Sequence, residues 1–167
     1  ETNFFSAFFF NIGVFAFILV GVSFFFIPKL FVNHRFAYMC ALIGSILMVM
    51  GCLLFAAVGL TPYDLYLKAH LFVTQNAFRL IVPATLFYLI ALYLVNIPKV
   101  YLSIGYIFFV SNILYVIYQF LFENPQAGEN SLIEGVIIQK IIIALCMLNI
   151  FSFSFAFAKL SEDNFSR

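Results

Sequence analysis

Few side chains in this sequence could do chemistry, because its 167 residues include only eight Lys and Arg, seven Asp and Glu, and two His. Four polar residues nevertheless follow one another in a single stretch, at spacings of four, seven and four: Asp64, Lys68, Gln75 and Arg79. On a helix these spacings keep the four side chains within a stripe about 60° wide, with Arg79 about 16 Å further along the axis than Lys68. The sequence therefore predicts one polar face on this helix.

A second polar group, Glu134 with Gln139 and Lys140, lies near the start of a later apolar stretch. Ser131 precedes Glu134 by three residues, which is the spacing of a capping box at a helix start. Gln139 and Lys140 would then lie about 9 Å beyond Glu134 along the helix axis. Because both polar helices would start at the same end of the fold, we expect the two groups to line one cleft between these helices. The alternative is two capped helices with charged anchors and no ligand.

The histidines and cysteines do not form a recognisable catalytic or metal-binding pattern. His70 lies about 120° around the helix from the Asp64 stripe, so a joint acid–base role would need the helix start to bend. His34 lies in a basic turn between two other apolar stretches and cannot share a metal or a haem with His70. The three cysteines lack metal-ligand spacing, and the hydrolase and nucleotide-binding motifs are absent. The sequence thus predicts no catalytic residue, no metal site and no cofactor, and gives no support for an enzyme.

The elements that must position these residues follow from composition. The chain is 65% hydrophobic and 9% charged, whereas soluble domains are about 45–50% apolar and about 25% charged. A bilayer is therefore the solvent, and only helices or a closed barrel can cross it. The apolar blocks are long and unbroken, which excludes the alternating pattern of barrel strands. We predict an all-α polytopic transmembrane bundle. A net charge of +1 without a Lys/Arg-rich run excludes nucleic acid as a partner.

Five stretches without a charged residue are long enough for transmembrane helices, which need about 20 residues each: 2–28, 36–63, 80–98, 100–122 and 141–158. Thr61 followed by Pro62 and Asp64 is typical of a helix start, as is Ser131 with Glu134. We therefore begin the third helix at Thr61 and the fifth at Ser131, and expect Pro83 to kink the third. The bundle would comprise residues 1–160, with a short, disordered polar tail at 161–167.

Lys and Arg near the helix ends predict the orientation, because basic segments stay in the cytoplasm. One end of the bundle would hold most of them: Lys29, Arg35, Lys99, Lys159 and Arg167. The opposite end offers Lys68, with Arg79 and Lys140 further inside the helices. We therefore expect a multi-pass membrane protein whose carboxyl terminus is cytoplasmic and whose polar cleft opens in the outer leaflet.

Several short motifs resemble those of uncharacterised bacterial and archaeal membrane proteins related to the Frag/DRAM/Sfk group. They are the run 59–64 (GLTPYD), His70, Ala77-Phe78, Glu134 and Gln139-Lys140, and Phe10-Asn11-Ile12-Gly13 is similar to the family's second helix. The resemblance implies six transmembrane helices, the first of which is absent here, and a role in lipid handling or membrane organisation. It implies no catalytic residues.

These observations favour an integral membrane protein that binds a lipid or another amphiphile in a polar cleft. Arg79 and Lys140 would hold an anionic headgroup, and three further residues would orient it or shuttle protons: Asp64, His70 and Glu134. Gln75, Gln139 and Lys68 would complete the site. The alternative is an accessory subunit that packs against other membrane subunits. A small transporter is a further possibility, although no inverted repeat supports it.

Overall fold

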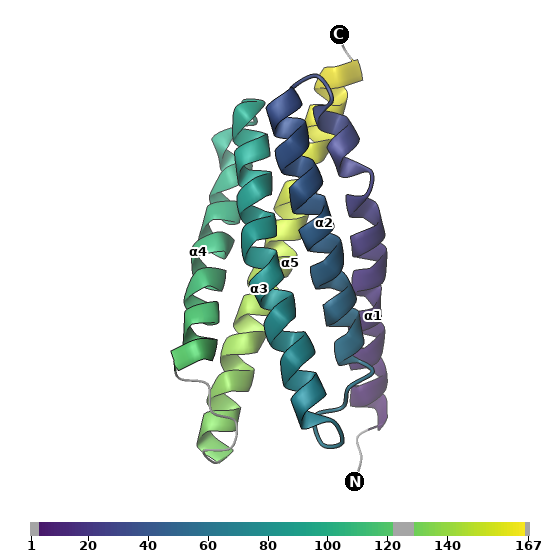
Figure 1. The fold of residues 1–167 in the computed structure, drawn as a ribbon, viewed down its shortest axis with the longest axis vertical. Helices are drawn as coiled ribbons and strands as arrows, with labels where there is room; N and C mark the ends of the chain where they lie inside the picture. Colours follow the sequence, from purple (N-terminus) through teal and green to yellow (C-terminus); the bar gives the residue numbers. More distant parts are fainter. Residues whose placement is uncertain (1–3, 122–128, 166–167) are drawn as a thin grey trace.

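The computed structural model describes residues 4–121 and 129–165, which form five long α-helices and one short 3-10 helix (Figure 1). The elements are α1 (Phe4–Phe24), η1 (Ile27–Phe31), α2 (Arg35–Val58), α3 (Leu67–Leu94), α4 (Lys99–Leu121) and α5 (Glu129–Phe165). The described residues contain no strand. The predicted all-α bundle with five helices is confirmed.

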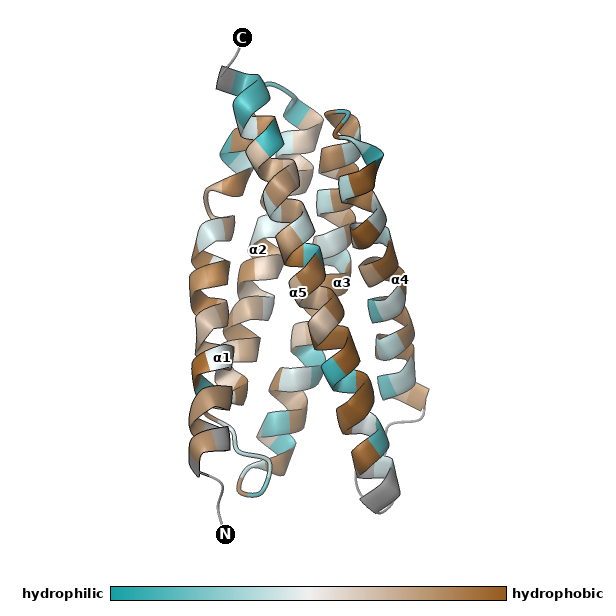
Figure 2. Ribbon diagram, turned by 180° about the vertical axis from the view of Figure 1, so that it is seen from behind, coloured by the Kyte–Doolittle hydropathy of each residue, from teal (hydrophilic) through white to brown (hydrophobic). Residues whose placement is uncertain are grey.

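All five helices are long and apolar enough to cross a membrane. Figure 2 shows apolar residues along most of the bundle's length, with hydrophilic residues gathered toward its two ends and along the lower parts of α3 and α5. This is the pattern of a multi-pass integral membrane protein. The middle of a transmembrane helix contacts lipid and has to be apolar, while its two ends meet water and headgroups.

Successive helices run in opposite directions, so the bundle has two distinct ends (Figure 1). The amino-terminal end holds the start of α1, the 59–66 connection and the starts of α3 and α5. The carboxy-terminal end holds η1, the 95–98 connection and the end of α5. α2 packs against α1 and most extensively against α3, whereas α4 packs against α3 and α5. α5 therefore lies behind α2 and α3 in Figure 1.

Two predicted helix starts differ from the structure. α3 begins at Leu67, not at Thr61, because the Thr61 hydroxyl donates hydrogen bonds to the carbonyl oxygens of Ala57 (3.0 Å) and Val58 (3.4 Å). It thus caps the end of α2, and Asp64 lies in the following turn rather than on a helix. α5 begins at Glu129, two residues before the predicted start at Ser131. Pro83 lies within α3, which continues past it to Leu94.

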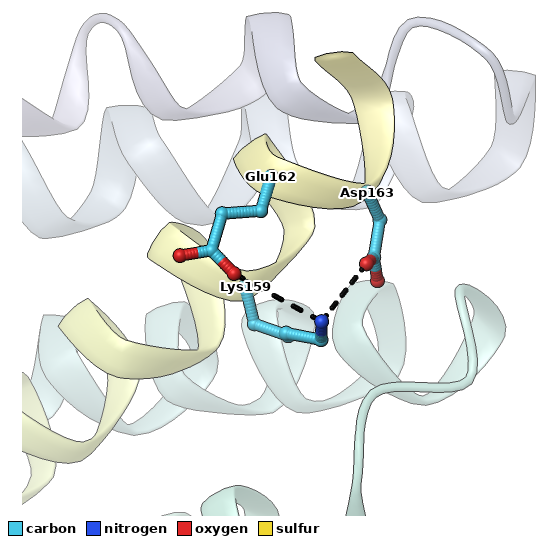
Figure 3. A network of polar contacts seen from close by, with 3 residues as sticks. All are labelled: Lys159, Glu162 and Asp163. Carbon is cyan, nitrogen blue, oxygen red and sulfur yellow. Dashed lines mark ion pairs between the residues drawn. The ribbon is translucent and has the colours of Figure 1, made fainter. Parts of the chain in front are cut away.

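The carboxy-terminal segment is helical as far as Phe165, so the expectation of a disordered tail from residue 161 was wrong for the described part of the chain. Lys159 forms ion pairs with Asp163 (3.1 Å) and Glu162 (3.9 Å), one turn further along α5 (Figure 3). Asn164 Nδ2 donates a hydrogen bond to the Leu30 carbonyl oxygen at 2.9 Å. The ion pairs lie within α5 and, being exposed, contribute little. The bond to Leu30 joins the end of α5 to η1.

An aromatic cluster of the core lies toward the carboxy-terminal end. Tyr88 of α3 is fully buried there, with its ring against Phe24, Phe153 and Phe157. Its hydroxyl shares a 2.6 Å hydrogen bond with the Ser45 hydroxyl of α2. Aromatic pairs of this kind add about 0.5–1.5 kcal/mol each beyond the area they bury. This cluster joins four of the helices.

Candidate functional site

A cavity of about 350 Å³ lies near the amino-terminal end, bordered mainly by α1 and α5. Its wall on α1 consists of Phe9, Phe10, Gly13, Val14 and Phe17, and its wall on α5 consists of Val136, Gln139, Lys140, Ile143 and Met147. Phe55 and Val58 of α2 and His70 of α3 complete the lining. The cavity is therefore mostly apolar, with three polar side chains at its border.

Helical spacing explains why these residues share the cavity. The α1 residues recur every three or four positions, as do those of α5, so each set forms one face of its helix. The faces of α1 and α5 do not close on each other here. A Cβ atom added at Gly13 would meet no atom within 4 Å, which shows how open the space beside α1 is.

Lys140 is the cation of the cavity. Among the described residues no carboxylate lies within ion-pair distance of its ammonium group. Its neighbour Gln139 is half-buried and also borders the cavity. Lys140 is exposed, and an ammonium group without an ion-pair partner beside apolar walls favours the approach of an anionic group.

His70 reaches the cavity from the first turn of α3 and is fixed by two contacts. Its Nδ1 lies 2.7 Å from the carbonyl oxygen of Thr61, and its ring meets the Tyr63 ring edge-on at 5.6 Å. A carbonyl oxygen only accepts hydrogen bonds, so Nδ1 carries the proton and donates it to this bond. The loop that precedes α3 thus orients the imidazole.

The structure brings together three of the eight predicted site residues: His70, Gln139 and Lys140. The expectation that Arg79 and Lys140 share one cleft between the third and fifth helices was wrong. Arg79 is not part of the cavity lining, because it lies nine residues beyond His70 and so points about 180° away around α3. α4, not α5, faces this side of α3.

Arg79 has local contacts of its own. Its guanidinium lies 4.2 Å from the centroid of the Phe120 ring of α4, and its Nη2 donates a hydrogen bond to Gln75 Oε1 at 3.3 Å. Phe120 is next to the last residue of α4, so the long side chain of Arg79 extends toward the amino-terminal end of the bundle. Cation–π and hydrogen-bond contacts thus stabilise the charge without the expected cleft.

The other predicted residues surround the amino-terminal end without lining the cavity. Asp64 is exposed in the 59–66 connection, Lys68 is exposed in the first turn of α3, and Glu134 is exposed near the start of α5. Within the described residues no group of His, Cys, Asp and Glu could hold a metal ion.

A second, smaller hollow of about 240 Å³ lies at the carboxy-terminal end, bordered by polar residues of the η1–α2 turn and the end of α5. His34 Nδ1 accepts a hydrogen bond from the Ala37 backbone N–H at 3.2 Å and so caps the start of α2. Asn33 Nδ2 donates to Asn164 Oδ1 at 3.3 Å. These side chains are engaged in holding the turn against α5, so their role is structural.

The α1 wall was missed by reasoning from the sequence. Phe9, Phe10 and Phe17 are among 25 phenylalanines spread over the chain, and an apolar face that borders a cavity has the same composition as one that faces lipid. The one available signal was Gly13, a residue without a side chain on this face of α1.

Comparisons with protein-family models, curated proteins and solved structures gave no significant match. The fold and composition define the class, a multi-pass helical membrane protein. The resemblance to relatives of the Frag/DRAM/Sfk group stays a prediction.

Proposed function

We propose that this membrane protein binds an amphiphile with an anionic headgroup in the cavity between α1 and α5. The observation that carries the proposal is the combination of apolar walls with one cation at their border, Lys140, which has no ion-pair partner among the described residues. The volume of about 350 Å³ lies within the range of about 300–1,000 Å³ that is usual for ligand pockets.

The walls and the cation have separate tasks. Phe10, Phe17 and Met147 would hold a hydrocarbon chain by van der Waals packing, because lipid tails are as apolar as these side chains. Lys140 would give a charge-assisted hydrogen bond to the headgroup. This bond would orient the ligand and select headgroups that carry a negative charge. The proposal retains the orientation expected from the basic residues, so the cavity would belong to the outer leaflet and the carboxyl terminus to the cytoplasm.

Native mass spectrometry with dodecanoate tests the proposal. Lys140→Gln is expected to lower the affinity for dodecanoate about 10- to 100-fold, because a charge-assisted hydrogen bond is lost. Arg79→Gln, on the opposite side of α3, is the matched control and should leave the affinity unchanged. Dodecanol, which has the same chain without the charge, should bind Lys140→Gln and the wild type equally.

A second variant tests the cavity itself. Gly13→Leu places a side chain in the open space beside α1, so it should abolish dodecanoate binding while the protein stays folded. Equal retention of dodecanoate by the wild type, Lys140→Gln and Gly13→Leu would contradict the proposal.

A second candidate function, an accessory subunit of a larger membrane complex, is favoured by the position of α1. Only 22% of its membrane window is buried against the rest of the chain, the smallest share of the five helices. An accessory subunit would copurify with larger subunits that cover α1. Isolation of the protein from its native membrane as a free monomer would count against this candidate.

A further inference from the structure

The bond between His70 and Thr61 fixes which ring nitrogen can serve a ligand. Since Nδ1 keeps its proton and donates it in the hydrogen bond to the Thr61 carbonyl oxygen, Nε2 of the neutral imidazole has no proton and is a hydrogen-bond acceptor. No described residue bonds Nε2. His70 borders the cavity with Nδ1 turned to the loop, so Nε2 is the polar atom that the ring has left for a ligand.

The cavity thus offers two kinds of polar group. The ammonium of Lys140 is a donor and a cation, which matches an anionic oxygen. The imidazole of His70 is an acceptor, which matches a hydroxyl group. An amphiphile that carries only an anionic oxygen would satisfy Lys140 and leave Nε2 of His70 unpaired against apolar walls, at a cost in free energy.

We infer that the preferred ligand is a single-chain amphiphile whose headgroup combines an anionic oxygen for Lys140 with a free hydroxyl for His70. This inference rests on the proposed function and names the class of its ligand. A volume near the lower end of the range for ligand pockets is suited to one hydrocarbon chain rather than two. Sites built to bind a hydroxyl discriminate against analogues that lack it, because the site's own polar group is left unpaired.

The test compares two probes that differ in one hydroxyl: dodecanoate and β-hydroxydodecanoate. At about pH 8 both probes carry an ionised carboxylate. The wild type should bind β-hydroxydodecanoate about three- to tenfold more tightly, which is the usual value of one neutral hydrogen bond. Isothermal titration calorimetry in detergent or nanodiscs measures the ratio.

The variant His70→Asn separates the structural bond from the ligand bond. The amide N–H of asparagine replaces Nδ1–H as the donor to Thr61, but the shorter side chain has no acceptor at the position of Nε2. We expect His70→Asn to keep its affinity for dodecanoate and to lose the preference for β-hydroxydodecanoate. His70→Ala, which loses both bonds, shows the cost of the structural bond.

The possible outcomes separate the inference from the proposed function. Equal affinity of the wild type for the two probes would overturn the inference and leave the proposed function standing, whereas no binding of either probe would overturn both. If His70→Asn still prefers β-hydroxydodecanoate, His70 does not bind the ligand hydroxyl. If this variant does not fold, ¹⁵N resonances of the wild-type imidazoles decide, because Nε2 of His70 should shift with β-hydroxydodecanoate and not with dodecanoate.

Discussion

At the carboxy-terminal end of the bundle, the ring of Tyr88 is enclosed by Phe24, Phe153 and Phe157, whereas at the amino-terminal end Phe9 and Phe10 border a cavity. Both regions contain phenylalanines of α1, and only the first also contains phenylalanines of α5. The two regions differ in whether the amino-terminal segment, α1 with η1, contacts α5. Aromatic composition therefore does not reveal whether a part of a membrane bundle is solid or hollow.

The contacts of η1 explain the difference. Phe31 of η1 packs edge-on against Phe157 of α5, and the Leu30 carbonyl accepts the hydrogen bond from Asn164. These contacts join η1 to α5 at the carboxy-terminal end, beside the smaller hollow of about 240 Å³. Among the described residues, α1 itself packs mainly against α2 rather than against α5.

The largest expected effect comes from removing an aromatic ring in the closed region. Phe153 is 1% exposed, and Phe153→Ala should lower the free energy of unfolding by about 3–5 kcal/mol, as large-to-small substitutions in a dense core do. Phe10→Ala, at the cavity wall, should cost far less because Phe10 is 52% exposed. Equilibrium unfolding in mixed micelles measures the free energy of unfolding of both variants. Similar losses in the two variants would mean that Phe10 is packed as closely as Phe153.

Two glycines give a smaller and sharper contrast. A Cβ atom at Gly105 would lie 2.8 Å from Leu89 Cδ2 and 2.9 Å from Phe153 Cε1. Gly105→Ala should therefore destabilise the protein by about 1–3 kcal/mol through overpacking. Gly13→Ala should instead stabilise it by up to about 1 kcal/mol, because alanine favours the helix and meets nothing there. A destabilising Gly13→Ala would mean that the space beside α1 is filled.

The smallest expected effect concerns the hydroxyl pair of Ser45 and Tyr88. Tyr88→Phe removes one partner and should cost about 1 kcal/mol, because the Ser45 hydroxyl is left buried without a hydrogen bond. The double variant Ser45→Ala with Tyr88→Phe should recover part of this loss. If the double variant loses the sum of the two single losses, the hydroxyls are not coupled.

The sequence was sufficient for the fold class because apolar length alone defines transmembrane helices, but local signals were ambiguous. Thr61 illustrates this: a hydroxyl near a proline can cap the start of one helix or, as here, donate to the carbonyls that end the preceding one. Spacing in the sequence is the same in both cases. Only the path of the chain between α2 and α3 decides.

Only part of the candidate site could be predicted, because sequence spacing does not identify the neighbours of a helix face. Helical periodicity places Arg79 and His70 on opposite sides of α3, but it does not say which neighbour each side meets. The Arg79 side faces Phe120 of α4, while His70 borders the same cavity as Gln139 and Lys140 of α5. The order of helices around the bundle is a tertiary property, and the α1 wall gave no polar signal from which to infer it.

The proposed occupant of the cavity between α1 and α5 is an anionic amphiphile. Photolabelling with a dodecanoate that carries a diazirine at its far end, followed by peptide mapping, tests it most directly. We predict that unlabelled dodecanoate competes for labels on α1 between Phe9 and Phe17 and on α5 between Val136 and Met147, and that Gly13→Leu abolishes them. Labels spread evenly over the lipid-facing helices, or concentrated beside Arg79 and Phe120, would contradict the claim.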